Sequence, residues 1–89
     1  MDIFLEQVPA SRRVVGYRQV VRGINGNQIR CVLIARDADS NIGNKIVSLC
    51  EQKSVPYRIV TDKAEIGKML NLDVACAVCA EKAEAKSKL

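Results

Sequence analysis

The chain has 89 residues, of which 48% are apolar, and this allows one domain with one hydrophobic core. The longest apolar run, residues 74–80, is too short to span a bilayer, and the acidic N-terminal stretch lacks the basic region of a signal peptide, so we expect a cytoplasmic protein. The net charge of +4 comes from the first 36 residues, which hold six arginines and two acids, whereas the eight basic and eight acidic residues after them balance.

The predicted elements begin with a helix, a strand and a second helix. Asp2–Val8 forms a capped helix, and Arg12–Val15 forms a short strand. Gly16 then opens a helix that runs to about Ile24. This helix ends at Asn25–Asn27, because Asn and Gly tolerate positive φ.

The helix that follows Gly16 has two chemically different faces. Its apolar face is formed at helical spacing by Tyr17, Val20, Val21 and Ile24. Arg18, Gln19 and Arg22 lie on the opposite face, beside the unpaired backbone N–H groups of a helix start. These donors favour an anionic partner that accepts hydrogen bonds, such as nucleic acid. The alternative is a solvated face that only keeps the protein soluble.

A strand–helix–strand unit occupies the middle of the chain. The β-branched apolar run Cys31–Ala35 predicts a central strand that is buried on both faces. Asp37–Ser40 forms the next turn and caps a helix, which Pro56 forces to end. Tyr57–Val60 is the following strand, and the connection is long enough for a right-handed parallel crossover.

One more helix and one more strand complete the prediction. Asp62 and Glu65 form a start that resembles a capping box, and Asn71 can close this helix in the left-handed conformation. A loop over Leu72–Ala75 leads into a strand over about Ala77–Ala80.

Helices and short strands therefore alternate along the whole chain. We predict one α/β domain over residues 1–80, a three-layer α/β/α sandwich around a small, four-stranded mixed sheet. Residues 81–89 form a charged tail without an apolar face, which we expect to be frayed helix or disordered.

Residues for catalysis or metal binding are scarce. The chain has no histidine, and Asp37 and Asp39 follow a strand without a partner nucleophile, so we expect capping roles and no enzyme activity. Cys76 and Cys79 have the spacing of half a zinc site, but no second ligand pair exists. Residues three apart in a strand also point to opposite faces. We therefore expect reduced core thiols, no metal and no cofactor.

Aromatic residues are scarce as well. With two tyrosines and one phenylalanine, the chain lacks the stacking platforms that proteins use to bind single-stranded nucleic acid. A structured RNA, recognised by its shape and a few base edges, fits this composition better.

Several segments together resemble one known family. The chain is similar to the kink-turn RNA-binding ribosomal proteins of the L-seven-Ae and L-thirty-e type, including their small bacterial relatives, over roughly Val14–Ala80. The segments that carry the resemblance are Val15–Arg22, Val32–Asp39, Cys50–Tyr57, Lys63–Lys68 and Leu72–Val74. They occur in the family's order and spacing.

The resemblance implies a site at the start of the second helix. Gly16 would let the backbone approach RNA closely, and Arg18 and Gln19 would read the tandem sheared G·A pairs in the major groove of the kink. Arg22 stands at the family's basic position. With the neighbouring Tyr17, these residues form the first part of the predicted RNA site.

The other parts of the implied site lie further along the chain. Asp39 would lie near the base that is extruded from the kink, Lys63 would contact RNA, and Leu72, Asp73 and Val74 would pack against the extruded base and help to set selectivity. The chain departs from the family pattern at Arg18, where many members have Asn, and at Ser40, where proline is common. The first departure concerns the exact base contacts and not the position of the site.

These observations lead to one expected function and one alternative. We expect a monomeric, non-enzymatic protein that stabilises kink-turn RNA, on the ribosome or on another structured RNA, without a membrane partner. The alternative is a protein-interaction module that has kept the fold and lost specific RNA binding. Retention of Arg18, Gln19 and Arg22 argues against this alternative.

Overall fold

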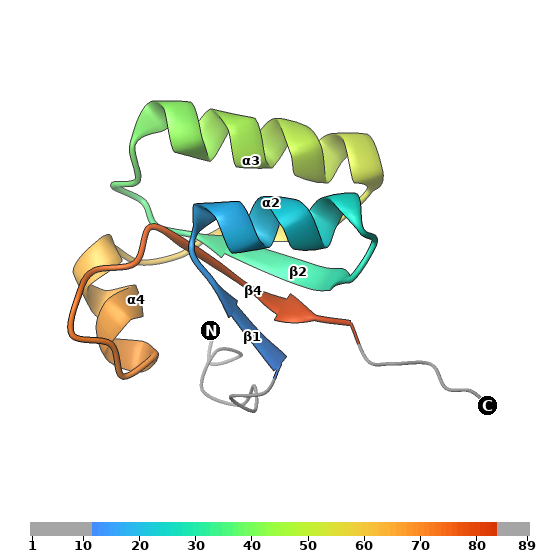
Figure 1. Ribbon diagram of the computed structural model, residues 1–89. Helices are drawn as coiled ribbons and strands as arrows, with labels where there is room; N and C mark the ends of the chain where they lie inside the picture. Colours follow the sequence, from blue (N-terminus) through green and yellow to red (C-terminus); the bar gives the residue numbers. More distant parts are fainter. Residues whose placement is uncertain (1–11, 84–89) are drawn as a thin grey trace.

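The computed structural model describes residues 12–83, which form three helices and a four-stranded sheet (Figure 1). In chain order the elements are β1 (Arg13–Val15), α2 (Tyr17–Asn25), β2 (Ile29–Ile34), α3 (Ser40–Lys53), β3 (Tyr57–Ile59), α4 (Lys63–Met69) and β4 (Val78–Lys82). The strand order is β1–β4–β2–β3; β2 and β3 are parallel, and β4 is antiparallel to both of its neighbours. This confirms the predicted α/β fold with a mixed sheet. The predicted helix over Asp2–Val8 lies outside the described residues.

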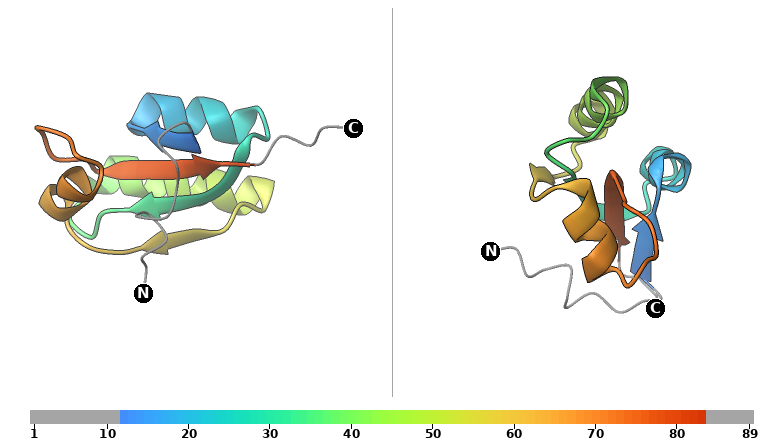
Figure 2. Two further views of the ribbon diagram at one scale, coloured as in Figure 1. Left: turned by 90° about the horizontal axis from the view of Figure 1, so that it is seen from below. Right: turned by 90° about the vertical axis from the view of Figure 1, so that its left-hand side faces the viewer.

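Helices cover both faces of the sheet. α2 and α3 pack on one face and α4 packs on the other (Figure 2). Side chains alternate along the central strand β2, so Val32 and Ile34 enter the core beneath α2 and α3, and Leu33 enters the core beneath α4. β2 is therefore buried on both faces, as its uninterrupted apolar run predicts. Within residues 12–83, no helix is long and apolar enough to cross a membrane.

The predicted helix caps are confirmed. Asp39 accepts a hydrogen bond from the backbone N–H of Asn41 at 2.8 Å, at the start of α3. Asp62 accepts one from the backbone N–H of Glu65 at 2.9 Å, at the start of α4. Asn71 follows α4 with φ 62°, the left-handed conformation expected there.

The last strand extends beyond its predicted end. β4 runs from Val78 to Lys82, so Glu81 and Lys82, predicted to lie in the tail, belong to the sheet. Glu81 is 5% exposed, and its carboxylate forms ion pairs with Arg12 at 3.3 Å and Arg30 at 3.4 Å. A buried carboxylate needs such partners because removal from water is costly. Both partners are distant in the sequence, so the local pattern indicates only a charged tail.

The thiol of Cys50 is fully buried in α3. All four cysteines are free. Burial, with a smaller contribution from Glu51, raises the pKa of Cys50 from 9.0 to about 11. The unfolded chain releases this proton from about pH 9 upward, whereas the folded chain keeps it to about pH 11. The stability that depends on this thiol is therefore complete below pH 9 and is lost as the pH rises through this window.

We expect the free energy of unfolding to fall across this alkaline window. Cys50 alone should contribute a slope of about 1.4 kcal/mol per pH unit. Denaturant titrations of the parent and of Cys50→Ala, compared at each pH, isolate this contribution, because the variant lacks the titrating thiol. The variant should be less stable than the parent below pH 9 and should show the flatter pH profile above it. Equal slopes for the two proteins would contradict a retained thiol proton.

Candidate nucleic-acid interface

Most of the predicted site residues belong to loops that lie at one end of the sheet. β1, β2 and β3 end there and β4 begins there, because β2 and β3 are parallel and β4 is antiparallel to β1 and β2. α2, α3 and α4 consequently all start at this end, on the left in Figure 1. Three helix N-termini, each with a partial positive charge, thus belong to one end of the molecule.

The start of α2 differs from the other two described helix starts. Gly16 occupies its N-cap position, and no side chain caps it. Asp39 and Asp62 cap α3 and α4. The first N–H groups of α2 therefore lack a side-chain acceptor and can donate to a ligand. Phosphate and carbonyl oxygens are suitable acceptors for such groups.

The backbone of Gly16 explains why a glycine stands here. Its φ of 98° and ψ of 152° fall in a region that is essentially restricted to glycine. Its N–H donates to the carbonyl oxygen of Val78 at 3.1 Å, and its carbonyl accepts from Val20 at 3.0 Å. No heavy atom lies within 4 Å of the position that a Cβ would occupy. The main chain is therefore open to close approach by a ligand.

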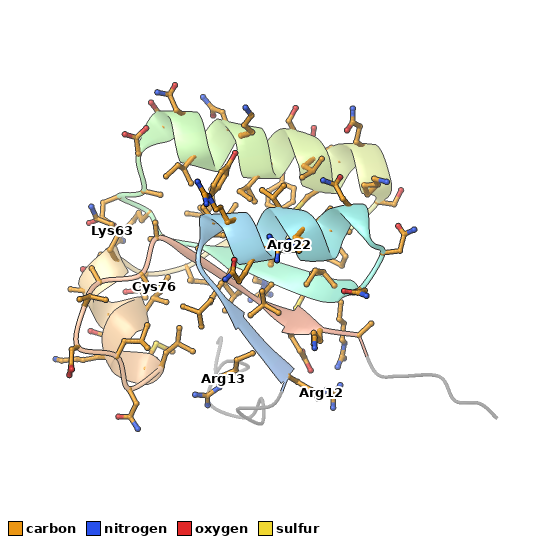
Figure 3. The ribbon with its side chains drawn as sticks, in the orientation of Figure 1. Arg12, Arg13, Arg22, Lys63 and Cys76 are labelled. Atoms are coloured by element: carbon orange, nitrogen blue, oxygen red, sulfur yellow. The ribbon has the colours of Figure 1, made fainter. Side chains whose placement is uncertain are left out.

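The polar residues of α2 lie on its exposed face. Arg18, Gln19 and Arg22 are exposed, and none of their side chains is paired with another described residue. Arg22 lies further along α2, in its last turn (Figure 3). Tyr17 differs from them, because it is half-buried and packs against the core beneath α2 and α3. Part of its role is therefore structural.

Hydrogen bonds hold Lys63 between two other loops at this end. The N–H of Lys63 donates to Oδ1 of Asp37 at 2.8 Å, and its carbonyl accepts from the N–H of Cys76 at 3.0 Å. Figure 3 shows Lys63 and Cys76 on the side of the molecule where α2 begins. Asp39 is exposed on the same turn as Asp37, with its carboxylate on the α3 cap. The fold thus brings Lys63 and Asp39 to the end at which α2 starts.

The loop Leu72–Val74 contributes unequally to the surface. Val74 is 69% exposed and Asp73 is also exposed, so both are accessible to a ligand. Leu72 packs against the core beneath α4 instead. Leu72 therefore anchors the loop, while Asp73 and Val74 form its outer surface.

Gly67, which the sequence analysis did not place in the site, determines how closely this loop approaches α4. It is buried, and a Cβ added there would collide with the carbonyl oxygen of Val74. The available signal was a glycine inside a helical pattern, which costs about 1 kcal/mol relative to alanine and therefore indicates a packing constraint.

Cys76 and Cys79 converge, contrary to the prediction that they point apart. Cys76 precedes β4 and does not belong to it, so both thiols enter the core beneath α4. A hydrogen bond from Cys79 stabilises the Cys76 thiolate and lowers the pKa of Cys76 to about 7, and the same bond raises the pKa of Cys79. Within residues 12–83, no group of three or more potential metal ligands comes together.

The fold and this surface define a small α/β sandwich that presents an uncapped helix start and exposed arginines at one end of its sheet. The sequence profile of the Ribosomal protein L7Ae/L30e/S12e/Gadd45 family matches residues 5–89, and the chain belongs to this family. The resemblance noted in the sequence is thereby confirmed.

Individual relatives are similar over most of the chain. RNA-binding protein TTE2299 of Caldanaerobacter subterraneus subsp. tengcongensis is 33% identical over 76 residues, which cover 85% of this chain and 92% of the relative. RNA-binding protein YlxQ of Bacillus subtilis is 30% identical over 69 residues, which cover 76% and 69%. The Giardia lamblia 15.5kD RNA binding protein superposes with a TM-score of 0.77 and 28% identity, covering 84% of this chain and 65% of that one. A Bacillus halodurans protein of unknown function gives a TM-score of 0.79 at 20% identity, covering 90% and 78%.

Proposed function

We propose that this protein binds RNA and that its target is a structured RNA bent at a kink-turn with tandem sheared G·A pairs. The observation that carries the proposal is the uncapped start of α2 at Gly16, with Arg18 and Gln19 exposed beside it. The relatives named as RNA-binding proteins support the first part of the proposal.

Each part of the surface has a distinct role in this proposal. Arg18 and Gln19 contact base edges in the major groove, where guanidinium and amide groups can form paired hydrogen bonds. Arg22, one turn further along α2, contacts phosphate. Asp39 and the exposed part of the loop Leu72–Val74 lie against the base that is extruded from the kink.

The proposed mechanism is a shift in RNA conformation without covalent chemistry. The protein binds the bent conformation in preference to the extended one, so binding increases the population of the bent state. Bending brings phosphate groups close together, and the charges of Arg22 and Lys63 reduce their repulsion. The target lies in ribosomal RNA or in another structured RNA.

A titration with two matched RNAs tests the proposal. One duplex carries the kink-turn, and in the other Watson–Crick pairs replace the G·A pairs, with salt held constant. We expect clearly tighter binding to the kink-turn. Equal and weak binding to both duplexes would leave only electrostatic attraction and would favour the protein-interaction module.

Two variants distinguish the contribution of base contacts to RNA affinity from that of phosphate contacts. Gln19→Ala should lose about 1–3 kcal/mol of discrimination between the two duplexes, as expected for one lost base contact. Arg22→Ala is the matched comparison on the same helix face, and it should weaken both duplexes alike and reduce the salt dependence. If Gln19→Ala weakened both duplexes equally, its base-reading role would be wrong.

A further inference from the structure

A groove between α2 and α3 begins at the proposed RNA site. Its volume is about 570 Å³, and it is lined by Tyr17 of α2 and by Asn41, Ile42, Asn44, Lys45 and Ser48 of α3. Tyr17 directly follows Gly16, so the groove opens at the uncapped helix start. From Asn41 to Ser48, α3 rises about 10 Å, so the groove extends the surface from the start of α2 along α3.

The polar side chains of this groove are unengaged. Asn41, Asn44, Lys45 and Ser48 are all exposed, and their side chains have no partner among residues 12–83. They present amide, ammonium and hydroxyl donors along one side of α3. Phosphate oxygens and ribose hydroxyls are acceptors that match this set.

The charges around the groove are of one sign along most of its length. α2 contains no acidic residue, and α3 contains none before Glu51. Glu51 lies near the far end of α3, where its carboxylate accepts a hydrogen bond from the hydroxyl of Tyr57 at 3.0 Å. Asp39 caps the start of α3 and therefore lies at the other end of this helix from Glu51. Between these two ends, the charged side chains of both helices are all cationic.

The composition of the lining favours a polyanion over a protein helix. Four of its six lining residues carry an amide, ammonium or aliphatic hydroxyl group, and none carries a carboxylate that would repel phosphate. Lys45 supplies the positive charge of the lining, and Arg18 and Arg22 add positive charge on the exposed face of the neighbouring α2.

We propose that this groove binds the sugar–phosphate backbone of the RNA strand that leaves the kink. Lys45 contacts a phosphate, and Asn44 contacts a phosphate or ribose oxygen beside it. This inference rests on the proposed function, because α2 must first place the kink at the mouth of the groove.

Two RNAs with the same kink-turn test the inference, one with its stems trimmed close to the kink and one with extended stems. Lys45→Ala should bind the extended RNA about four- to sixfold more weakly at about 0.15 M salt, because one lost phosphate contact changes the log–log salt slope by about 0.7–0.9. The variant should bind the trimmed RNA as the parent does. Asn44→Asp, a nearly isosteric change that adds a negative charge, should likewise weaken binding of the extended RNA alone.

Lys53→Ala is the matched control, because Lys53 is also exposed but lies in the last turn of α3. It should change the affinity for neither RNA. If Lys45→Ala bound the extended RNA with parental affinity, the inference would be overturned and the groove would be available to a protein partner. If the parent showed no preference for the kink-turn over its Watson–Crick counterpart, the proposed function would fail first. Gln19→Ala should weaken both kink-turn RNAs, which separates the two proposals.

Discussion

The Gly16→Ala variant is expected to lose about 1–3 kcal/mol of unfolding free energy. An alanine at this position must either hold φ 98° and ψ 152° or rotate away from them. Rotation would disturb the hydrogen bond from the N–H of residue 16 to Val78, which ties the start of α2 to β4. Crowding is not the cause, since no heavy atom lies within 4 Å of the new Cβ. Denaturant titration measures the loss.

The same variant should also bind kink-turn RNA more weakly while it is still fully folded. The added methyl group enters the open space above Gly16, which the proposed function assigns to RNA. Any rotation of the backbone would also redirect the first N–H groups of α2. RNA titration at a temperature well below the unfolding transition separates this effect from the loss of stability.

Gly26→Ala, at the other end of α2, is the matched control. Gly26 has φ −88° and ψ 7°, which alanine adopts without strain, and the nearest contact of a Cβ would be the carbonyl oxygen of Arg22 at 3.4 Å. This substitution should change stability and RNA affinity little. If Gly16→Ala behaved like Gly26→Ala, neither the backbone strain nor the close approach of RNA could be maintained.

The fold follows from the sequence wherever contacts are local or periodic. The run Cys31–Ala35 identifies the central strand because only a strand covered on both faces needs uninterrupted apolar side chains. Asp39 and Asp62 identify two helix starts, since a cap depends on atoms two or three residues away. The exposed cationic face of α2 is predictable for the same reason, because one helical period assigns every residue to a side.

Features that depend on distant partners could not be predicted in this way. In the sequence, Glu81 looks like part of a charged tail. Its partners Arg12 and Arg30 become its neighbours only when the sheet forms. The convergence of Cys76 and Cys79 depends on the loop before β4, because Cys76 lies in that loop and the alternation of side chains along a strand does not apply to it. The specific RNA target came from the family resemblance alone, because charge and periodicity do not distinguish one structured RNA from another.

The Gly67→Ala variant is expected to combine a loss of about 1–3 kcal/mol in unfolding free energy with weaker RNA binding. Its Cβ would collide with the carbonyl oxygen of Val74 and would lie 3.2 Å from Cα of Ala75. Both atoms belong to the backbone, so a change of rotamer cannot relieve the contact. The N–H of Leu72 donates to the carbonyl of Gly67 at 2.8 Å, and this bond resists movement of the loop.

Gly43→Ala in α3 shows what the same change does without a collision. No heavy atom lies within 4 Å of the position of its Cβ, and alanine is the better helix former, so we expect a gain of about 0.5–1 kcal/mol. Helix propensity acts in the same direction at Gly67. Opposite signs for the two variants would therefore assign the loss at Gly67 to its contact with the loop.

The effect of Gly67→Ala on RNA binding tests whether the loop belongs to the site. A shift of Val74 would move the exposed part of Leu72–Val74 away from the base that it is proposed to contact, while leaving Arg18 and Gln19 in place. The variant should bind the kink-turn more weakly but should still prefer it to the Watson–Crick duplex, whereas Gln19→Ala should lose that preference. Parental affinity in Gly67→Ala, together with a measured loss of stability, would remove the loop from the RNA site and leave the start of α2 as its center.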